Sequence, residues 1–323
     1  MDGQTINFHS ERIITAAHPF GIFNIELTNH CPMKCVMCPR TNHMTREQGF
    51  MGIEIFKKII DELAEANPSF HHNQNRVVWL HHFGESLLHP QFETCIKYAA
   101  DQGIYTGLSI NPMMLNEKTA SSLISSGLHI LYLSLDGHDD ESFLKIRGIN
   151  NMYTLSRRRI YDFLKLKKES FSEMKIILSM IDFTLNDESI SAVKDEWESN
   201  KEINGFLLKN FTTWDGAIPE INDVAPESLK AKTGDKKAVT CQFPWTNMTV
   251  TWDGDVVPCC FDYNKKFVIG NVRSNTLGNI WNDIPMQNLR HEFITNNVTN
   301  ALCKNCDNLY SGNSCSINSL VNL

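Results

Sequence analysis

Residues 26–40 read Glu26-Leu27-Thr28-Asn29-His30-Cys31-Pro32-Met33-Lys34-Cys35-Val36-Met37-Cys38-Pro39-Arg40 and follow an apolar segment that begins at Phe23. This stretch places the thiols of Cys31, Cys35 and Cys38 in one tight loop. Three thiolates hold a cubane iron–sulfur cluster and leave its fourth iron open, so that a small molecule can chelate it. A zinc ion would need a fourth local ligand, and His30, which could be proposed for that place, directly abuts Cys31.

A second set of cysteines lies in the last quarter of the chain. Cys241, Cys259, Cys303 and Cys306 are separated by 17, 43 and 2 residues. Four thiolates are enough to close a cluster completely, although they also hold a structural zinc ion well. One open and one closed cluster in a single chain indicate radical chemistry combined with electron storage.

The first cysteine set and the motifs that follow it resemble those of radical S-adenosylmethionine (AdoMet) enzymes. The later segments that carry the resemblance are His82-Phe83-Gly84-Glu85-Ser86, Leu108-Ser109-Ile110-Asn111, Ser134-Leu135-Asp136-Gly137 and Arg147-Gly148. The resemblance covers roughly residues 22–211. Met37 stands where the family commonly has an aromatic residue, and Phe83 and Ser86 replace Gly and Pro, but no cluster ligand is lost.

The resemblance implies a role for each of these positions. Cys31, Cys35 and Cys38 would hold the [4Fe-4S] cluster that binds AdoMet, and Gly84 and Glu85 would bind its amino group. The implied ribose contacts are Ser109, Asn111 and Ser134. Arg147 would pair with the AdoMet carboxylate or form a surface salt bridge, and Met37 would pack on the adenine or within the loop.

The second cysteine set resembles the twitch module, the shortened relative of the SPASM extension. Segments similar to that module are Pro244-Trp245, Asp253-Gly254, Val268-Ile269-Gly270-Asn271 and Ile280-Trp281-Asn282. The resemblance implies one auxiliary [4Fe-4S] cluster on Cys241, Cys259, Cys303 and Cys306, because a full SPASM extension has more cysteines than this region. Cys260 and Cys315 are bystanders or thiols placed to donate a hydrogen atom, and Cys95 is expected in the core of a helix.

Composition narrows the class of protein. Ten cysteines in 323 residues are well under the ~8–10% of a disulfide scaffold, and their clustering suits a reducing cytoplasm. A net charge of −7 without a Lys/Arg stripe argues against nucleic acid as a partner. We find no signal peptide, and no apolar run approaches the ~18 residues of a membrane helix.

Short apolar strands alternate with amphipathic helices from residue 23 to residue 211. Strands are predicted at 23–28, 77–83, 105–110, 129–136, 175–182 and 205–211, and helices at 52–66, 90–102, 116–126, 139–146, 151–169 and 187–198. Strands that are each followed by a helix imply a parallel sheet, and the family fold that agrees is a partial (β/α)6 barrel. Sites in such barrels lie at the carboxyl ends of the strands.

The chain is therefore expected to be an α/β protein with a small C-terminal α+β auxiliary-cluster domain. The expected divisions are an N-terminal extension at 1–22, the barrel at 23–211, a linker or lid at 212–240, and the auxiliary-cluster domain at 241–323. A hairpin is predicted across Trp252-Asp253-Gly254, between strands at 248–251 and 255–257. Helices are predicted at 277–281 and 285–293.

The resemblance implies that AdoMet is cleaved to a 5'-deoxyadenosyl radical that abstracts a substrate hydrogen, with flavodoxin or ferredoxin as an expected electron donor. We favour oxidation of a secondary alcohol of a sugar, cyclitol or aminoglycoside-like substrate. Epimerisation with a cysteine hydrogen donor and peptide maturation remain alternatives, and a zinc scaffold without catalysis is a different class. Candidate substrate residues are Glu26, His82, Asp136, Lys209, Trp214 and Asp215.

Overall fold

A six-stranded parallel sheet forms the larger part of the fold. The computed structural model describes residues 13–16, 18–181, 187–209, 213–216, 218, 239–306 and 308–309. Its parallel strands lie in the order β6-β5-β4-β3-β2-β1. Their bounds are β1 (Ile22–Ile25), β2 (Val78–Trp79), β3 (Thr106–Ile110), β4 (Ile130–Ser134), β5 (Lys175–Ile181) and β6 (Gly205–Lys209). The predicted α/β partial barrel is confirmed.

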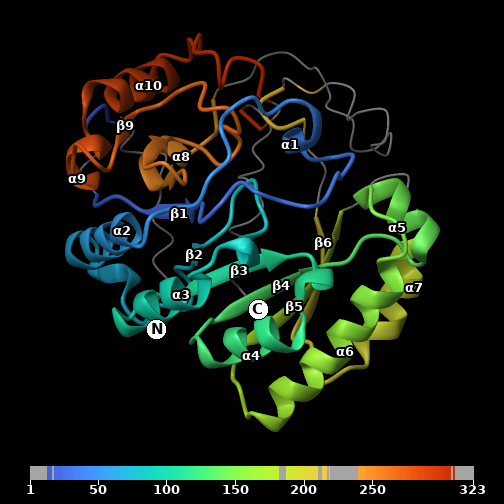
Figure 1. Ribbon diagram of the computed structural model, residues 1–323. Coiled ribbons are helices and arrows are strands. Elements are labelled where there is room, and N and C mark those ends of the chain that lie inside the picture. Colours follow the sequence, from blue (N-terminus) through green and yellow to red (C-terminus); the bar gives the residue numbers. More distant parts are fainter. Residues whose placement is uncertain are drawn as a thin grey trace, which may run out of the picture.

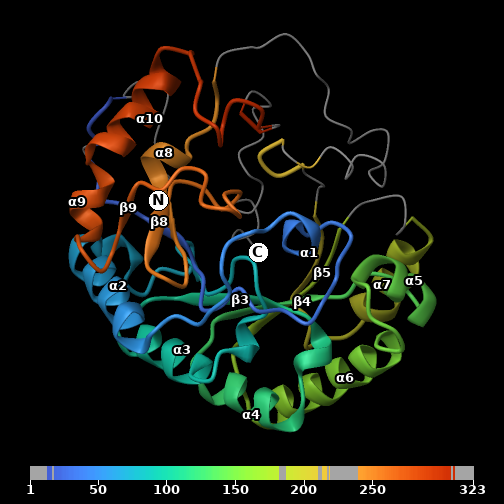
Figure 2. The same ribbon diagram turned by 45° about the horizontal axis from the view of Figure 1, so that its top comes forward.

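Helices cover the outer face of this sheet in an arc (Figures 1 and 2). They are α2 (Ile53–Ala66), α3 (Phe92–Asp101), α4 (Glu117–Ser125), α5 (Asp140–Arg147), α6 (Tyr153–Glu169) and α7 (Asp187–Glu198). The short α1 (Pro39–Asn42) and three 3₁₀ turns, η1 (Pro68–Phe70), η2 (Ser86–Leu88) and η3 (Pro112–Met114), lie in the connections. All six predicted helices are confirmed, because their apolar residues recur at helical spacing. In α2, for example, Phe56, Ile59 and Leu63 are fully buried.

The C-terminal part extends the same sheet. It contains α8 (Phe243–Thr246), β7 (Met248–Val250), β8 (Asp255–Val257), β9 (Gly270–Asn271), α9 (Leu277–Trp281) and α10 (Ile284–Ile294). Strand β7 pairs in parallel with β1, while β8 and β9 continue antiparallel. The predicted hairpin is confirmed, and Gly254 takes its left-handed position with φ of 89°. The predicted C-terminal helices are also confirmed.

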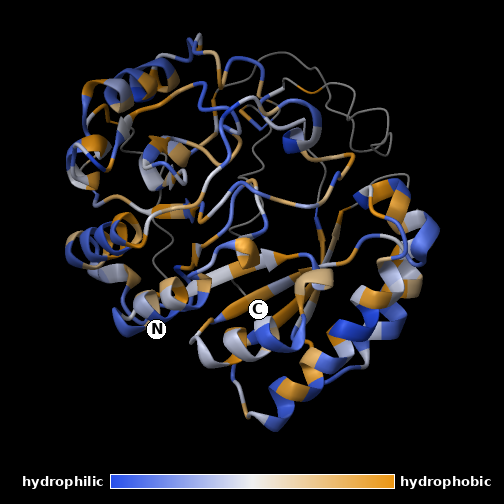
Figure 3. Cartoon of the chain, in the orientation of Figure 1, coloured by the Kyte–Doolittle hydropathy of each residue, from blue (hydrophilic) through white to orange (hydrophobic). Residues whose placement is uncertain are grey.

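The two faces of the barrel sheet carry different side chains. The outer face packs with the helices in one large apolar core, and β4 and β5 are accordingly among the most hydrophobic segments in Figure 3. The inner face carries a cluster of aromatic and aliphatic side chains, called the floor below, that includes Phe23, Trp79, Ile130, Tyr132 and Ile177. Gly107 lies beside Trp79 in the register of β2 and β3, and a Cβ there would come within 2.6 Å of the indole ring.

Candidate functional site

The three-cysteine loop connects β1 to α2 and is held against the end of α5. The amide of Lys34 donates to the carbonyl of Arg147 at 3.1 Å, and the amide of Val36 donates to the carbonyl of Ile146 at 3.0 Å. Inside the loop, the Thr41 hydroxyl donates to the carbonyl of Cys35 at 2.9 Å. These backbone contacts fix the path of the cysteine loop relative to the barrel.

The thiols of this loop suit a cationic cluster. Burial, together with the charge of Glu85 and a smaller contribution from Cys35, raises the pKa of Cys31 to about 11. Burial and the charge of Cys35 raise the pKa of Cys38 to about 12. Thiols this close together are held as thiolates only if a cation lies among them. Within the described part of the chain, no three Cys, His or carboxylate side chains are grouped tightly enough for a single metal ion. A cluster that takes one thiolate per iron atom needs no such convergence on one point.

Gly84 and Glu85 come to the edge of this loop from the end of β2. A Cβ on Gly84 would lie 2.0 Å from the carbonyl oxygen of Thr28, so only glycine permits this approach. The amide of Glu85 donates to the carbonyl of His30 at 2.8 Å. Its carboxylate accepts from the amide of Asn111 at 2.9 Å, and burial raises the pKa of Glu85 to about 7.

Asn111 presents a buried donor at the end of β3. Its Oδ1 accepts from the amide of Met113 at 3.0 Å. Its Nδ2 is buried and has no hydrogen-bond partner among the residues that the structure describes. An unpaired buried donor is costly unless a ligand satisfies it, and a ribose oxygen is a suitable acceptor. The predicted cofactor residues Gly84, Glu85 and Asn111 therefore lie together beside the cysteine loop.

A row of three serine hydroxyls crosses the inner face of the barrel. Ser109 Oγ lies 3.1 Å from Ser134 Oγ, which lies 3.2 Å from Ser179 Oγ. The structure thus brings the predicted Ser109 and Ser134 together and adds Ser179 on β5, which the sequence reasoning missed. Alternate residues of a strand face the same side of a sheet, so the sequence of β5 could indicate that Ser179 faces inward. Only the register between β4 and β5 shows that Ser179 lies beside Ser134.

His81 and Lys209 complete the polar part of the inner face. The Nδ1 atom of His81 accepts from the amide of Ser109 at 3.1 Å, so the neutral ring carries its proton on Nε2. Burial lowers the pKa of His81 to about 3, with the charge of Lys209 adding to the effect. Lys209 Nζ lies 5.5 Å from the centre of the Tyr132 ring, and burial lowers the pKa of Lys209 to about 8. His81 was not predicted from the sequence.

Arg147 lies between the cysteine loop and Asp136. Its Nη1 donates to Cys35 Sγ at 3.6 Å, and its Nη2 forms an ion pair with the fully buried Asp136. Burial disfavours the charged guanidinium, but Asp136 and Cys35 outweigh that cost and raise the pKa of Arg147. Its role as a partner of the AdoMet carboxylate stays a prediction, whereas its contacts with the protein brace the loop.

Glu26, a candidate for substrate contact, is committed to internal contacts. Its carboxylate accepts from Arg46 Nη1 at 2.6 Å and from the amides of Phe83 at 3.2 Å and Trp252 at 3.3 Å. Burial opposes ionisation, but His82 and Arg46 hold the pKa of Glu26 well below its usual range. His82 itself directs Nε2 to the carbonyl of Cys260 at 2.7 Å. Both residues join the barrel to the C-terminal part.

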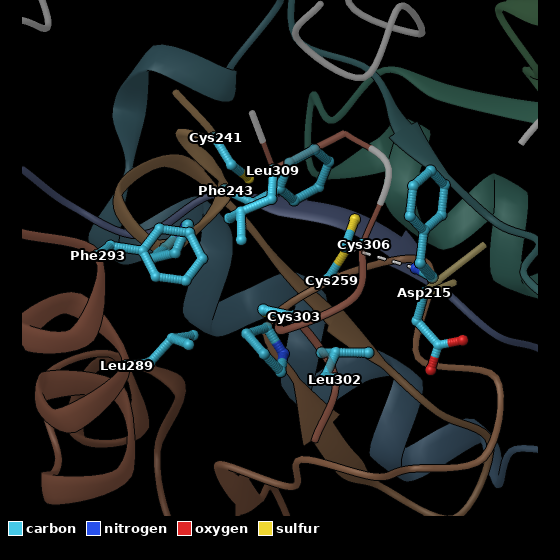
Figure 4. A pocket seen from close by; sticks show the side chains of 13 residues that line it. Asp215, Cys241, Phe243, Cys259, Leu289, Phe293, Leu302, Cys303, Cys306 and Leu309 are labelled. Atoms are coloured by element: carbon cyan, nitrogen blue, oxygen red, sulfur yellow. Dashed lines mark hydrogen bonds between the residues drawn. The ribbon is translucent and has the colours of Figure 1, made fainter. Parts of the chain in front are cut away.

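The second cysteine set converges on one cavity, shown in Figure 4. All four predicted ligands line it, and the empty space between its walls, which includes space open to solvent, is about 400 Å³. The other lining residues are apolar except for Asp215: they are Phe243, Pro244, Pro258, Phe261, Leu289, Phe293, Leu302 and Leu309. Burial raises the pKa of Cys303 well above its usual value, and the nearby charges of Cys259, Cys306 and Cys241 add to this. The donor set therefore fits a closed cluster.

Two of the remaining cysteines, Cys95 and Cys260, lie within the described residues. Cys95 is buried in the core on α3, as predicted. Cys260 does not line the four-cysteine cavity; it packs with the aromatic floor of the barrel, which includes Phe23 and Trp79. Cys315 lies outside the described residues.

The family comparisons agree with this geometry. Residues 25–196 match the radical SAM superfamily, and residues 241–307 match SPASM, an iron–sulfur cluster-binding domain. The chain therefore belongs to the radical SAM superfamily and is an enzyme of that type. Accordingly, it uses a [4Fe-4S] cluster and AdoMet, and its SPASM region carries auxiliary iron–sulfur chemistry.

Two relatives are similar over most of their length. The tungsten-containing aldehyde ferredoxin oxidoreductase cofactor-modifying protein of Pyrococcus furiosus is 24% identical over 317 residues, which cover 87% of this chain and 86% of the relative. The S-adenosyl-L-methionine-dependent 2-deoxy-scyllo-inosamine dehydrogenase of Niallia circulans is 22% identical over 297 residues, which cover 90% and 94%.

A solved structure shares the fold. Streptococcus suis SuiB bound to the precursor peptide SuiA has a TM-score of 0.65 and 16% identity, covering 95% of this chain and 74% of that chain. At this identity the likeness shows the fold and carries no substrate class. No described helix is long and apolar enough to cross a membrane.

Proposed function

We propose that this enzyme oxidises a secondary alcohol of a sugar, cyclitol or aminoglycoside-like substrate to a ketone. The observation that carries the proposal is the convergence of four cysteines on a single apolar cavity, which suits a group that stores one electron. A relative that is similar over 94% of its own length is a dehydrogenase. Flavodoxin or ferredoxin remains the expected electron donor.

Residues of both cysteine sets would hold the cofactors in this proposal. Cys31, Cys35 and Cys38 hold the cluster that binds AdoMet, while Cys241, Cys259, Cys303 and Cys306 hold one auxiliary cluster. When bound, these groups supply the removal of a hydrogen atom and of one electron, which together with loss of the hydroxyl proton converts an alcohol to a ketone.

The inner wall of the barrel is chemically suited to a polyol. Its serine row offers three hydroxyls, each able to donate and accept, and neutral His81 offers an Nε2–H donor. The aromatic floor with Trp79 and Tyr132 gives this wall an apolar base. Substrate hydroxyls are therefore oriented by short-range hydrogen bonds in a site that limits water.

Lys209 is the group that we assign to the substrate proton. Its pKa of about 8 leaves a fraction of the amine neutral near pH 7, and a neutral amine accepts a proton from a hydroxyl. Nζ lies over the Tyr132 ring on the inner face of the sheet. The proton from the substrate oxygen thus goes to Nζ, which completes the oxidation.

The test uses anaerobically reconstituted enzyme and a panel of cyclitols and amino sugars that begins with 2-deoxy-scyllo-inosamine. We expect a product two mass units lighter than the substrate and one AdoMet consumed per product. A product of unchanged composition that gains one deuterium in heavy water would replace oxidation with epimerisation.

The burial of Cys260 favours epimerisation as a second candidate function. Its side chain belongs to the floor cluster with Phe23 and Trp79 and is not among the residues that line the auxiliary cavity, so a thiol on the inner side could return a hydrogen atom to the substrate. In that case Cys260→Ala abolishes deuterium incorporation, whereas Cys95→Ala, which removes a buried thiol on α3, does not. Retention of the lighter product in Cys260→Ala supports the oxidation instead.

A further inference from the structure

Trp214 lies between the two cysteine sets. On one side it packs in a small apolar cluster with Phe83 and Tyr263, against which Cys38 also packs. On the other side it packs against the floor cluster that contains Phe261 and is flanked by Cys259 and Cys306. A single indole therefore contacts apolar groups from both candidate cluster sites.

A hydrogen bond and a ring contact join Trp214 to the first site. Its Nε1–H donates to the carbonyl of Met37 at 3.0 Å, directly before Cys38 in the chain. Its ring centre lies 5.0 Å from that of Phe83, within the range of favourable aromatic pairs. The indole is thus tied both to the backbone and to the side chains of the first site.

Two further contacts continue to the second site. The rings of Trp214 and Phe261 meet edge to face, with centres 5.7 Å apart. The amide of Phe261 then donates to Cys259 Sγ at 3.4 Å, the dashed line in Figure 4. From the Cys38 backbone to the Cys259 sulfur, the route crosses two hydrogen bonds and one aromatic contact.

The backbone around Trp214 is constrained to hold this position. Trp214 has a φ of 62°, a left-handed conformation that costs a bulky residue free energy. A Cβ on Gly216 would lie 2.1 Å from the carbonyl oxygen of Asn305. The backbone at Gly216 therefore packs directly against the loop between Cys303 and Cys306. Asp215, between them, lines the four-cysteine cavity and pairs with Lys266.

We propose that the Trp214 ring is the electronic bridge between the two cluster sites. One electron leaves the reduced auxiliary site at Cys259 and one electron arrives at the oxidised site at Cys38, so neither Trp214 nor Phe261 changes its net oxidation state. The proposal rests on the proposed function only for the use of this electron, because the transfer itself requires no substrate. In the oxidation of an alcohol it would return the substrate electron for another AdoMet cleavage.

The experiment follows electron exchange in protein that carries both clusters but no substrate. Both clusters are reduced, excess reductant is removed, and AdoMet is added to oxidise the first site. Freeze-quench electron paramagnetic resonance then records loss of the auxiliary signal as the first site is reduced again. Iron content and circular dichroism establish that each variant is loaded and folded.

Two substitutions separate a bridge from a structural brace. Trp214→Phe keeps an aromatic ring but loses the hydrogen bond to Met37, and Trp214→Leu loses both. We expect the Leu variant to lose most of the exchange rate. The Phe variant should lie between the Leu variant and wild type, because its ring keeps the aromatic contacts with Phe83 and Phe261 but not the hydrogen bond to Met37. Trp252→Leu is the matched control, because the Trp252 indole donates to the carbonyl of Glu47 in the same loop at 3.3 Å; its exchange rate should match wild type.

Equal slowing in the Phe and Leu variants would assign Trp214 to bracing the loop and overturn the bridge. Wild-type exchange in a fully loaded Leu variant would overturn it as well. Neither result bears on alcohol oxidation, which is read separately from the mass of the product.

Discussion

At the scale of single residues, the buried charged groups have two kinds of role. Some form ion pairs that stabilise the fold, and one, Lys209, is a candidate for proton transfer. Glu26 with Arg46 and Asp136 with Arg147 are buried pairs whose oxygens and nitrogens point at each other. Removing one member of such a pair typically costs about 3–5 kcal/mol, because the other charge is left uncompensated. Lys209 differs from these pairs, because burial lowers its pKa and so disfavours its charged form.

The first prediction concerns the pH dependence of Lys209. Its surroundings are His81 on the β2 loop, Tyr132 on β4, and Asp136 and Arg147 beyond them. If neutral Nζ accepts the substrate proton, turnover rises with pH through about 8. Lys209→Arg stays protonated and should lose that rise together with most of kcat. A Lys209→Arg enzyme with the wild-type pH profile would contradict the assignment.

The stability of the apo protein gives an independent reading of the same group. The folded pKa of about 8 lies below the unfolded value of 10.5, so the unfolded chain binds more protons between these values and stability rises with pH across that window. At pH 7 the cost of the partly buried ammonium is fully present. The free energy of unfolding of Lys209→Met, measured by urea denaturation at pH 7, should therefore exceed that of wild type by about 1 kcal/mol. This gain should shrink above pH 8.

At the scale of elements, the end of α5 sets the position of the cysteine loop. Gly148 ends this helix with a φ of 69°, and its missing Cβ leaves room for the carbonyl of Lys34. The sequence could predict that the segment after β4 and the cysteine loop lie at the same edge, because the carboxyl ends of parallel strands share it, but not that the loop contacts the end of α5. It could not predict the register that aligns Ser109, Ser134 and Ser179, because hydrogen bonds between strands far apart in the sequence determine it.

The second prediction is that Gly148→Ala loosens this junction. The left-handed backbone costs about 1–2 kcal/mol for a residue with a Cβ, and the new atom would lie 2.6 Å from the Lys34 carbonyl oxygen. We expect reconstituted protein to lose most of the iron at the first site and keep the auxiliary iron. Gly127→Ala is the control: it has a similar φ of 83°, and its Cβ would meet Ala100 instead. Equal iron loss in both variants would show that general destabilisation is responsible.

At the scale of the whole molecule, one sheet connects the loop of the first cysteine set with Cys259 of the second. The loop with Cys31, Cys35 and Cys38 follows β1, which is hydrogen-bonded to β7. Strand β7 pairs in turn with β8, and β8 leads into the Cys259 turn. The strand and helix pattern predicted the barrel and the hairpin correctly, because local periodicity determines them. It gave no sign that β7 would join β1, since nothing in the sequence of a three-residue strand identifies its neighbour.

The third prediction follows from this shared sheet and separates the two clusters. Wild-type protein reconstituted anaerobically should carry about eight iron atoms, and the combined Cys31→Ala, Cys35→Ala and Cys38→Ala variant about four. Cys303→Ala should also retain about four, but with dithionite it should still cleave AdoMet while forming no oxidised product. Metal binding and folding are coupled, so Cys303→Ala should have a lower melting temperature than wild type. Because β7 is paired with β1, we expect the loss of structure to be confined to the C-terminal edge of the sheet. Wild-type protein that never exceeds four iron atoms would contradict the presence of two clusters. An alcohol cannot lose two electrons to a single hydrogen-atom abstraction, so the oxidation needs an electron acceptor. Normal product yield from folded Cys303→Ala would show that the auxiliary cluster is not that acceptor.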